Sequence, residues 1–285
     1  MAVQPIDSIL PQEPEVSLLT SAHKFPANEA AFDRWRTGVS ARDLGCLSAT
    51  SEAGVCPEAG DRFTPTTLGL HEFFPLVTYL PHGCDGFVDD PPRWVEEAKA
   101  SLRARVPYTI ARELWTGAES GSASLQSTAI LSSDTGLTPV AGIASALADF
   151  EECTQGGMTP FIHAPSSVIG SLSVNGYFER KGARLLTATG AVVVPGPGYP
   201  NSVGAWGPLT DPEDLESGAE SAEGQVWVYV TGPVQIPDLV FPDSPVDEWW
   251  NRGNSFETAP RVWSIARFDT CCVFAALVTV PDAEV

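Results

Sequence analysis

Basic residues are scarce in this chain of 285 residues. It contains 16 Lys and Arg against 36 Asp and Glu, for a formal net charge of −20, and Lys24, Lys99 and Lys181 are its only lysines. The stretches 113–179 and 185–251 contain no Lys or Arg. Wrapping nucleic acid requires a basic face for phosphate contacts, and adhesion to anionic lipid requires basic clusters. The composition therefore argues against both activities.

Long apolar runs are also absent. No stretch of about 18 apolar residues exists, so we expect no membrane span, and the N-terminus lacks the basic and apolar regions of a signal peptide. Hydrophobic residues nevertheless make up 43% of the chain and charged residues only 18%. A disordered chain has the opposite balance. We therefore expect a folded protein with one large domain or two modest ones.

The six cysteines show no disulfide framework. They are Cys46, Cys56, Cys84, Cys153, Cys271 and Cys272. Without a secretion signal, paired disulfides are not expected, and the adjacent Cys271 and Cys272 suit two faces of a strand. A zinc site from Cys46, Cys56, His82 and Cys84 lacks the usual C-x₂-C pair. Buried, reduced cysteine is the better interpretation.

No local pattern identifies an active site. Ser120 stands one place too late for the G-x-S-x-G nucleophile elbow, and 196–198 reads as a turn rather than a dinucleotide loop. His163, at a strand-to-helix junction, is a candidate catalytic residue, but a structural histidine is favoured. The acidic run 211–223 lacks the alternation of a calcium loop, and Trp249-Trp250 favours packing or an interface. We therefore predict no catalytic, cofactor-binding or metal-binding residues.

The expected elements give an α+β protein. The clearest is a helix over 89–116, in which apolar residues from Trp94 to Leu114 recur every four residues around an internal Pro107. Further helices are expected around 29–35, over 139–153 and over 166–172. Strands are expected over 73–80, 159–164, 185–189, 191–194, 225–231, 261–268 and 271–280, the last of them central in a sheet because it is almost wholly apolar.

From Asp89 onward the chain resembles the major capsid proteins of tailed bacteriophages, the Hong Kong 97-type fold. The likeness rests on the order of elements more than on strict motifs. Asp90-Pro91-Pro92 opens a long helix that closes in Arg112-Glu113-Leu114-Trp115-Thr116-Gly117 and a Gly-rich turn that ends at Gly121. The family's long helix often opens at a similar Asp-x-Pro and closes in a Glu-x-x-Leu-x-x-Gly segment. The remaining matching segments follow in family order: 139–153, 160–165, 185–195, 230–234 and 261–280.

The resemblance implies a division of the chain into the parts of that fold. These are an N-terminal arm (1–45), an extended E-loop over a neighbouring subunit (46–75), a peripheral domain (76–184) with its spine helix (89–116), an axial domain (185–260), and C-terminal strands that return to the peripheral domain (261–285). In some relatives a Lys on the E-loop forms a covalent crosslink between subunits. No lysine lies in 46–88, so we expect no such crosslink.

The implied function is structural rather than enzymatic. The chain would assemble with itself into hexamers and pentamers of an icosahedral shell around double-stranded DNA, without sequence-specific contacts, cofactors or a membrane. Scaffolding, portal and decoration proteins are possible partners, and the expected location is the virion, assembled in the host cytoplasm. Three alternatives stay open: an encapsulin-like nanocompartment shell, a soluble enzyme with His163 in a cleft, and a decoration or tail protein.

Overall fold

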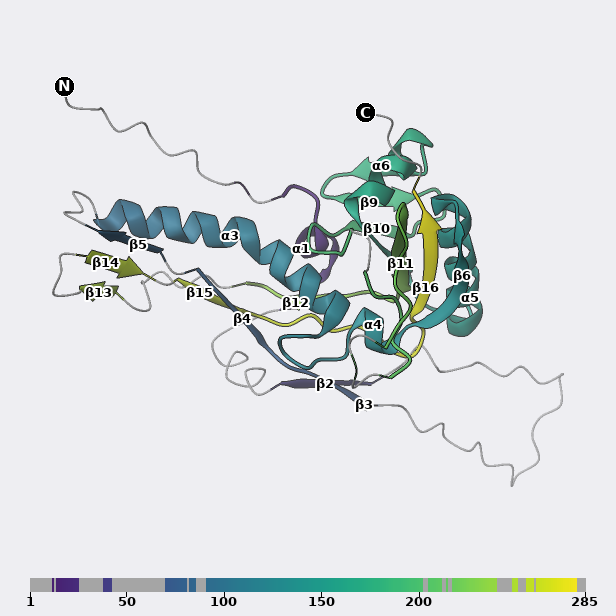
Figure 1. Ribbon diagram of the computed structural model, residues 1–285, viewed down its shortest axis with the longest axis horizontal. Coiled ribbons are helices and arrows are strands. Elements are labelled where there is room, and N and C mark those ends of the chain that lie inside the picture. Colours follow the sequence, from purple (N-terminus) through teal and green to yellow (C-terminus); the bar gives the residue numbers. More distant parts are fainter. Residues whose placement is uncertain are drawn as a thin grey trace, which may run out of the picture.

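The computed structural model combines a compact part with an elongated limb (Figure 1). It describes residues 12, 14–25, 38–42, 70–80, 82–85, 91–201, 205–211, 214, 217–239, 248–250, 255–258 and 260–280. The helix expected around 29–35 lies outside these residues, as do Cys46 and Cys56. The mixture of helices and sheets confirms the α+β class.

A seven-stranded mixed sheet, in the order β6-β16-β11-β7-β10-β9-β8, organises the compact part. Its strands are β6 (Ile130–Leu137), β7 (Phe161–Ala164), β8 (Phe178–Lys181), β9 (Arg184–Thr187), β10 (Val192–Pro195), β11 (Gln225–Thr231) and β16 (Phe274–Thr279). β16 pairs with β6 in parallel and with β11 in antiparallel orientation, and β7 pairs in parallel with β10. The prediction that the final apolar strand is central is confirmed.

Alternate side chains of this sheet enter two separate cores. Val226, Val228 and Val230 of β11 face one core, whereas Trp227 and Tyr229 face the other, as the two-residue period of a strand requires. The first core also contains α5 (Pro139–Thr154) and α6 (Ser166–Val174). The second contains α1 (Leu18–Ser21), α4 (Leu125–Thr128) and part of α3 (Pro91–Thr116). Helices therefore cover both faces (Figure 1).

The limb is built on α3, which is 26 residues long. Its predicted apolar stripe is confirmed, because Ala98, Leu102, Val106, Ile110 and Leu114 are all buried. Pro107 lies inside the helix, where proline removes a backbone hydrogen bond, and the helix bends along its length in Figure 1.

Short strand pairs accompany α3 along the limb (Figure 1). They are β4 (Leu76–Tyr79) with β15 (Arg261–Ser264), and β14 (Ser255–Thr258) between β13 (Glu248–Trp250) and β5 (His82–Asp85). Two further pairs are β2 (Val39–Arg42) with β3 (Leu70–Phe73), and β1 (His23–Phe25) with β12 (Gln235–Pro237).

Several element predictions need correction. The single strand expected over 73–80 is two strands, β3 and β4, separated by Phe74 and Pro75, since proline cannot donate to a strand ladder. The strand expected over 261–268 ends at Ser264. The hairpin expected at Gly190 is confirmed: β9 and β10 pair in antiparallel orientation, and Gly190 has a φ of 90°.

The prediction of unpaired, reduced cysteines is wrong for Cys153 and Cys272. They form a disulfide with a Cα–Cα distance of 5.9 Å, which joins the end of α5 to the segment before β16. The two residues are 119 positions apart. Reasoning from compartment and sequence spacing missed the bond because packing of α5 on the sheet brings the two residues together. Cys271 and Cys272 precede β16 rather than lying within it.

The disulfide predicts a reductant-sensitive melting temperature. In the chain-entropy model, closing a loop of this length stabilises the fold by about 5 kcal/mol, so reduction is expected to lower the Tm by about 10 °C. Differential scanning calorimetry with and without dithiothreitol measures the change. Cys153→Ser is the matched control, because it should melt early and lose its response to reductant. An unchanged wild-type Tm under reduction would contradict the bond.

Candidate functional site

The turn after α3 is fixed by the carboxylate of Glu113. This nearly buried group accepts hydrogen bonds from the backbone N–H of Glu119 (3.1 Å), the backbone N–H of Ser120 (2.9 Å) and the hydroxyl of Ser120 (2.5 Å). Gly117 ends the helix with a φ of 64°, and a Cβ there would collide with the carbonyl oxygen of Ser122. The turn therefore requires glycine at 117 and an acceptor at 113.

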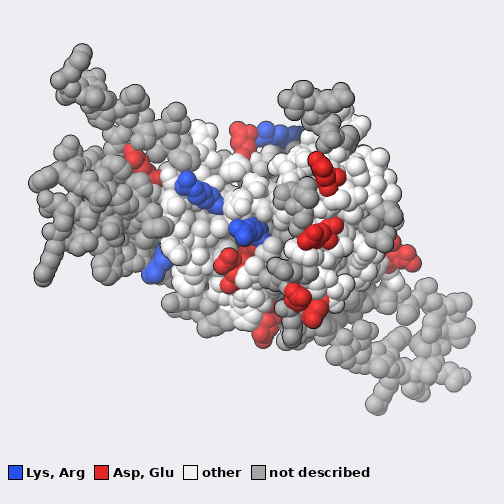
Figure 2. All heavy atoms as spheres, in the orientation of Figure 1, with Lys and Arg blue, Asp and Glu red and all other residues white. Residues whose placement is uncertain are grey.

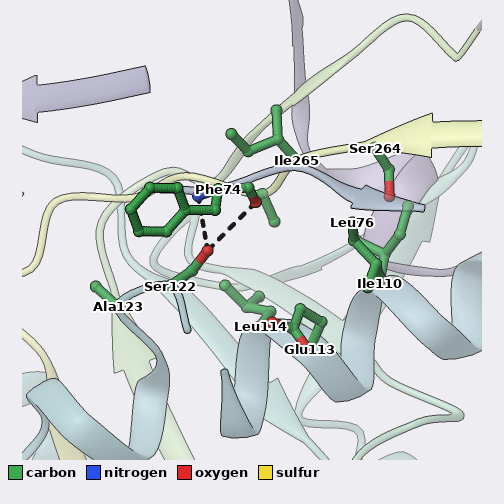
Figure 3. Close-up of a pocket in the computed structure, with 10 residues that line it drawn as sticks. Phe74, Leu76, Ile110, Glu113, Leu114, Ser122, Ala123, Ser264 and Ile265 are labelled. Atoms are coloured by element: carbon green, nitrogen blue, oxygen red, sulfur yellow. Dashed lines mark hydrogen bonds between the residues drawn. The ribbon is translucent and has the colours of Figure 1, made fainter. Parts of the chain in front are cut away.

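Ser122 connects this turn to the strands of the limb through hydrogen bonds (Figure 3). Its hydroxyl oxygen accepts from the backbone N–H of Phe74 at 2.8 Å and lies 3.3 Å from the carbonyl oxygen of Phe74. Because Ser120 gives its one hydroxyl proton to Glu113, the hydroxyl of Ser122 is the donor in the 2.6 Å hydrogen bond between the two serines. A continuous hydrogen-bonded path therefore links the end of α3 to the junction of β3 and β4.

This junction lies at one end of the segment 46–75, which the resemblance implies is an extended E-loop and which we call the excursion. β2 and β3 pair in antiparallel orientation from Val39 opposite Phe73 to Arg42 opposite Leu70, so the intervening chain leaves and returns at one place. Phe73 is fully buried, with its ring 5.6 Å from that of Phe268. The strand ladder thus holds the described residues on the two sides of 43–69 together.

The cavity beside this junction has a volume of about 10 Å³, close to the smallest space that holds one water molecule. Phe74, Leu76 and Ile110 help to line it (Figure 3). The side chains at the junction are therefore closely packed.

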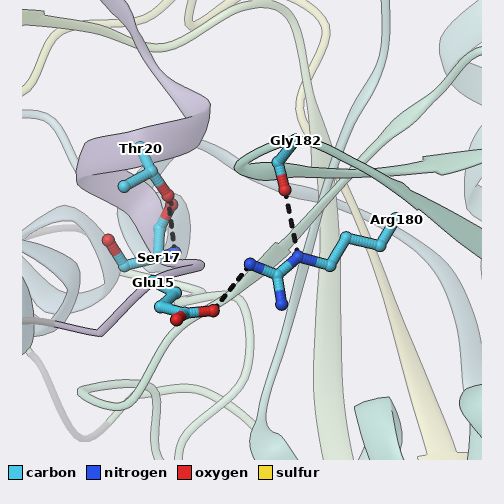
Figure 4. A network of polar contacts seen from close by, with 5 residues as sticks. All are labelled: Glu15, Ser17, Thr20, Arg180 and Gly182. Carbon is cyan, nitrogen blue, oxygen red and sulfur yellow. Dashed lines mark hydrogen bonds and ion pairs between the residues drawn. The ribbon is translucent and has the colours of Figure 1, made fainter.

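The segment before β1 is likewise joined to the compact part (Figure 4). Leu18 and Leu19 of α1 are buried in the core shared with α3. Glu15 forms an ion pair with Arg180 at 2.7 Å, and Arg180 also donates to the carbonyl of Gly182 at 3.0 Å. The ion pair is exposed and contributes little. Burial of the two leucines is therefore the main attachment of this segment.

His163 lies in the core of the sheet and not in a cleft. Its Nδ1 is 2.7 Å from the hydroxyl of Tyr199, and its Nε2 is 2.9 Å from the hydroxyl of Thr231. Thr231 donates its own proton to the carbonyl of Gly232, so its oxygen accepts from Nε2–H and Nδ1 accepts from Tyr199. Burial lowers the pKa of His163 to about 3. Such a neutral, enclosed ring fits the structural interpretation of this residue.

The predicted turn at 196–198 also has a structural explanation. A Cβ on Gly198 would collide with the backbone carbonyl of Tyr108 on α3. The glycine therefore permits close approach of this turn to the long helix, which is unrelated to phosphate binding.

The described part of the chain holds one cluster of sulfur ligands. The sulfur atoms of Cys153, Cys271 and Cys272 lie within 4.8 Å of one another. Metal ligation requires thiolates, and Cys153 and Cys272 are joined in the disulfide. The prediction of no metal site stays a prediction, and Cys46 and Cys56 of the rejected zinc set lie outside the described residues.

Among the described residues, no helix is both long enough and apolar enough to cross a bilayer.

Comparison with solved structures identifies the fold. The capsid of Ralstonia phage GP4 matches with a TM-score of 0.55 at 9% identity, covering 100% of this chain and 96% of that one. The capsid of an empty GTA particle matches with a TM-score of 0.54 at 10% identity, covering 98% and 94%. The SrpI encapsulin of Synechococcus elongatus matches with a TM-score of 0.50 at 11% identity, covering 99% and 94%.

No protein-family model matches the chain, and no curated protein matches it. At such low identity the structural matches establish the fold alone. The chain has the Hong Kong 97-type fold of phage capsid proteins over essentially its whole length, as the order of its elements predicts.

The Glu113 anchor predicts a graded loss of stability. Glu113→Ala removes the acceptor of three hydrogen bonds, two of them from backbone N–H groups, and should cost about 2–3 kcal/mol. Ser122→Ala, the milder comparison, removes the link to Phe74 and should cost about 1 kcal/mol. Urea unfolding gives both free energies. Equal effects, or none for Glu113→Ala, would show that the carboxylate does not hold the turn.

The enclosed His163 predicts loss of stability in mild acid. Its pKa falls from 6.5 when unfolded to about 3 when folded, so the unfolded state takes up the proton first. The contribution of neutral His163 to the free energy of unfolding is complete above pH 6.5. It declines by about 1.4 kcal/mol per pH unit as the pH falls toward 3. Urea unfolding of the wild type and of His163→Gln between pH 7 and 4 tests this. The variant should show the shallower pH dependence, and identical slopes would refute the assignment.

Proposed function

We propose that the chain is the major capsid protein of a tailed bacteriophage and that it assembles into hexamers and pentamers of an icosahedral shell around double-stranded DNA. The observation that carries this proposal is the match to phage capsid chains over 98–100% of its length. A match to only one part of the chain would be compatible with a different overall function. Here the match includes both the limb and the compact part.

The anchored excursion supports the same proposal. In a shell, a projecting segment transmits load between subunits only when its base is rigid. The β2–β3 ladder and the Glu113–Ser122 path supply such a base. We assign 46–75 to the E-loop, 1–45 to the N-terminal arm and 89–116 to the spine helix.

The proposed axial domain (185–260) and peripheral domain (76–184) share hydrogen bonds. The central sheet takes β7 from the peripheral segment and β10 and β11 from the axial segment. Strands of the proposed axial domain thus pair with a strand of the proposed peripheral domain. We therefore expect the two domains to move as one unit during assembly.

The acidic composition suits a shell that is filled by a motor. With a net charge of −20, the wall would repel the duplex rather than trap it, so packaged DNA could move freely. We expect no sequence-specific DNA contact. Scaffolding, portal and decoration proteins are the proposed partners, and the proposed location is the virion after assembly in the host cytoplasm.

An encapsulin-like nanocompartment is the second candidate. The match to the SrpI encapsulin over 99% of this chain favours it. Both functions involve a shell, so the contents of the purified particles distinguish the two. Nuclease-protected DNA inside purified particles identifies a capsid, whereas a co-purifying protein cargo without DNA identifies a nanocompartment.

Negative-stain electron microscopy of the expressed full-length chain, after sizing by light scattering, tests the shell function. Hollow shells or ring-shaped capsomers are expected. A 30 kDa species that persists at high concentration, and also when the chain is co-expressed with the proteins encoded beside it, would contradict the proposal.

We further predict no covalent crosslink between subunits. The lysines of the chain are Lys24, Lys99 and Lys181, and none lies in the proposed E-loop. The ammonium of Lys99 is nearly buried and pairs with Glu96 at 3.0 Å. Boiled, denatured particles should run as one band near 30 kDa on a gel, and a ladder of multiples would overturn the prediction.

A further inference from the structure

Three cysteines come together at the end of α5. Cys153 lies in the last turn of that helix, whereas Cys271 and Cys272 lie in the segment before β16. Their sulfur atoms are all within 4.8 Å of one another, and a disulfide joins Cys153 to Cys272. Because disulfides are opened by reductants, this cluster has a second chemical state in which all three side chains are thiols.

Packing of the core holds the two sides of the cluster together in addition to the disulfide. Phe150 of α5 and Ala276 of β16 are fully buried in the same core. Cys272 is itself buried in that core, and the backbone N–H of Cys271 donates to the carboxylate of Asp269 at 3.1 Å. We therefore expect the three sulfur atoms to stay close together when the disulfide is opened.

The spacing of the sulfur atoms fits a soft metal ion. Thiolates bind Zn²⁺ at about 2.3 Å, and sulfur atoms around a tetrahedral ion at that distance are about 3.8 Å apart. Sulfur atoms within 4.8 Å of one another therefore need to move by only about 1 Å. Thiolate ligands also select Zn²⁺ and Cu⁺ over Mg²⁺ and Ca²⁺. Three protein ligands leave a fourth position for water.

The electrostatic surroundings of the cluster favour a cation. Cys153 lies at the C-terminal end of a helix of 16 residues, where the helix dipole is negative. Glu151 and Glu152 are exposed beside it, and no Lys or Arg occurs in 113–179. Figure 2 shows Asp and Glu side chains spread over this face of the compact part. Such a surface attracts a divalent cation.

We propose that the reduced chain binds one soft divalent metal ion, of the Zn²⁺ class, through the thiolates of Cys153, Cys271 and Cys272. A dithiol reductant gives two electrons and two protons to the disulfide and becomes a disulfide itself. The metal ion then displaces one proton from each of the three thiols, and these protons pass to solvent.

The metal ion and the disulfide are alternative ties between the same two segments. Each joins the end of α5 to the chain before β16 through sulfur, so the ion replaces the covalent bond while the chain is reduced. Cytosolic thiols are kept reduced, and the metal-bound state is therefore the one expected during synthesis. The inference goes beyond the shell function and does not depend on it.

Cadmium binding to a full-length chain that retains only this cluster tests the proposal. The reference variant carries Cys46→Ser, Cys56→Ser and Cys84→Ser, which remove the remaining cysteines. A phosphine opens the disulfide, taking up the oxygen of one water molecule as it is oxidised, and is then removed under nitrogen. Circular dichroism establishes that the reduced chain is folded before CdCl₂ is added.

One equivalent of Cd²⁺ should produce the ultraviolet charge-transfer absorption of cadmium–thiolate bonds. Cys271→Ser in the reference variant should bind at least tenfold more weakly, because one thiolate is lost. Cd²⁺ should also raise the Tm of the reduced reference variant, since a ligand of the folded state stabilises it. The oxidised form of the same chain is the matched control, and its Tm should not respond to Cd²⁺.

Three results would overturn the proposal: no cadmium–thiolate absorption in the folded, reduced chain, equal affinity with and without Cys271, or equal affinity in urea, which would show that the folded site contributes nothing. If the reference variant does not fold, the wild type and its Cys271→Ser variant give the same comparison of affinities. Shells that form from a chain without Cd²⁺ binding would leave the shell function intact while the metal site fails.

Discussion

The central sheet is buried on both faces, and this burial determines where the helices and the limb are placed. Along β11 and β16, alternate side chains enter separate cores, so the middle of each strand must be apolar on both faces and each face needs its own helical cover. α5 and α6 cover one face. α1 and the C-terminal part of α3 cover the other, which fixes the limb to the compact part through the same core.

This shared core explains how an elongated limb remains rigid. Trp115, near the end of α3, packs its ring 4.5 Å from Tyr229 of β11 and 4.8 Å from Tyr199. Tyr199 in turn hydrogen-bonds His163 of β7. The end of α3 is thus held by the sheet, and the Glu113–Ser122 path extends that order to the base of the excursion.

Sequence reasoning succeeded where one residue pattern determines one element. The stripe of α3, the apolar β16 and the hairpin at Gly190 each follow from local periodicity or turn chemistry. It missed β6, an edge strand of the sheet, because Ser132 to Thr135 lack the alternation of apolar and polar residues by which a strand is recognised. It also missed the Cys153–Cys272 bond, since the two residues are 119 positions apart in the sequence. The Glu113 anchor had one local signal, a glutamate four residues before the helix-ending Gly117.

In the proposed function, many copies of this chain form one closed shell. A cryo-electron microscopy reconstruction of assembled particles should then show capsomers with fivefold and sixfold symmetry into which the fold fits, with each excursion reaching a neighbouring subunit. Particles in which the chain instead occupies isolated sites on a wall made by another protein would contradict it and identify a decoration protein.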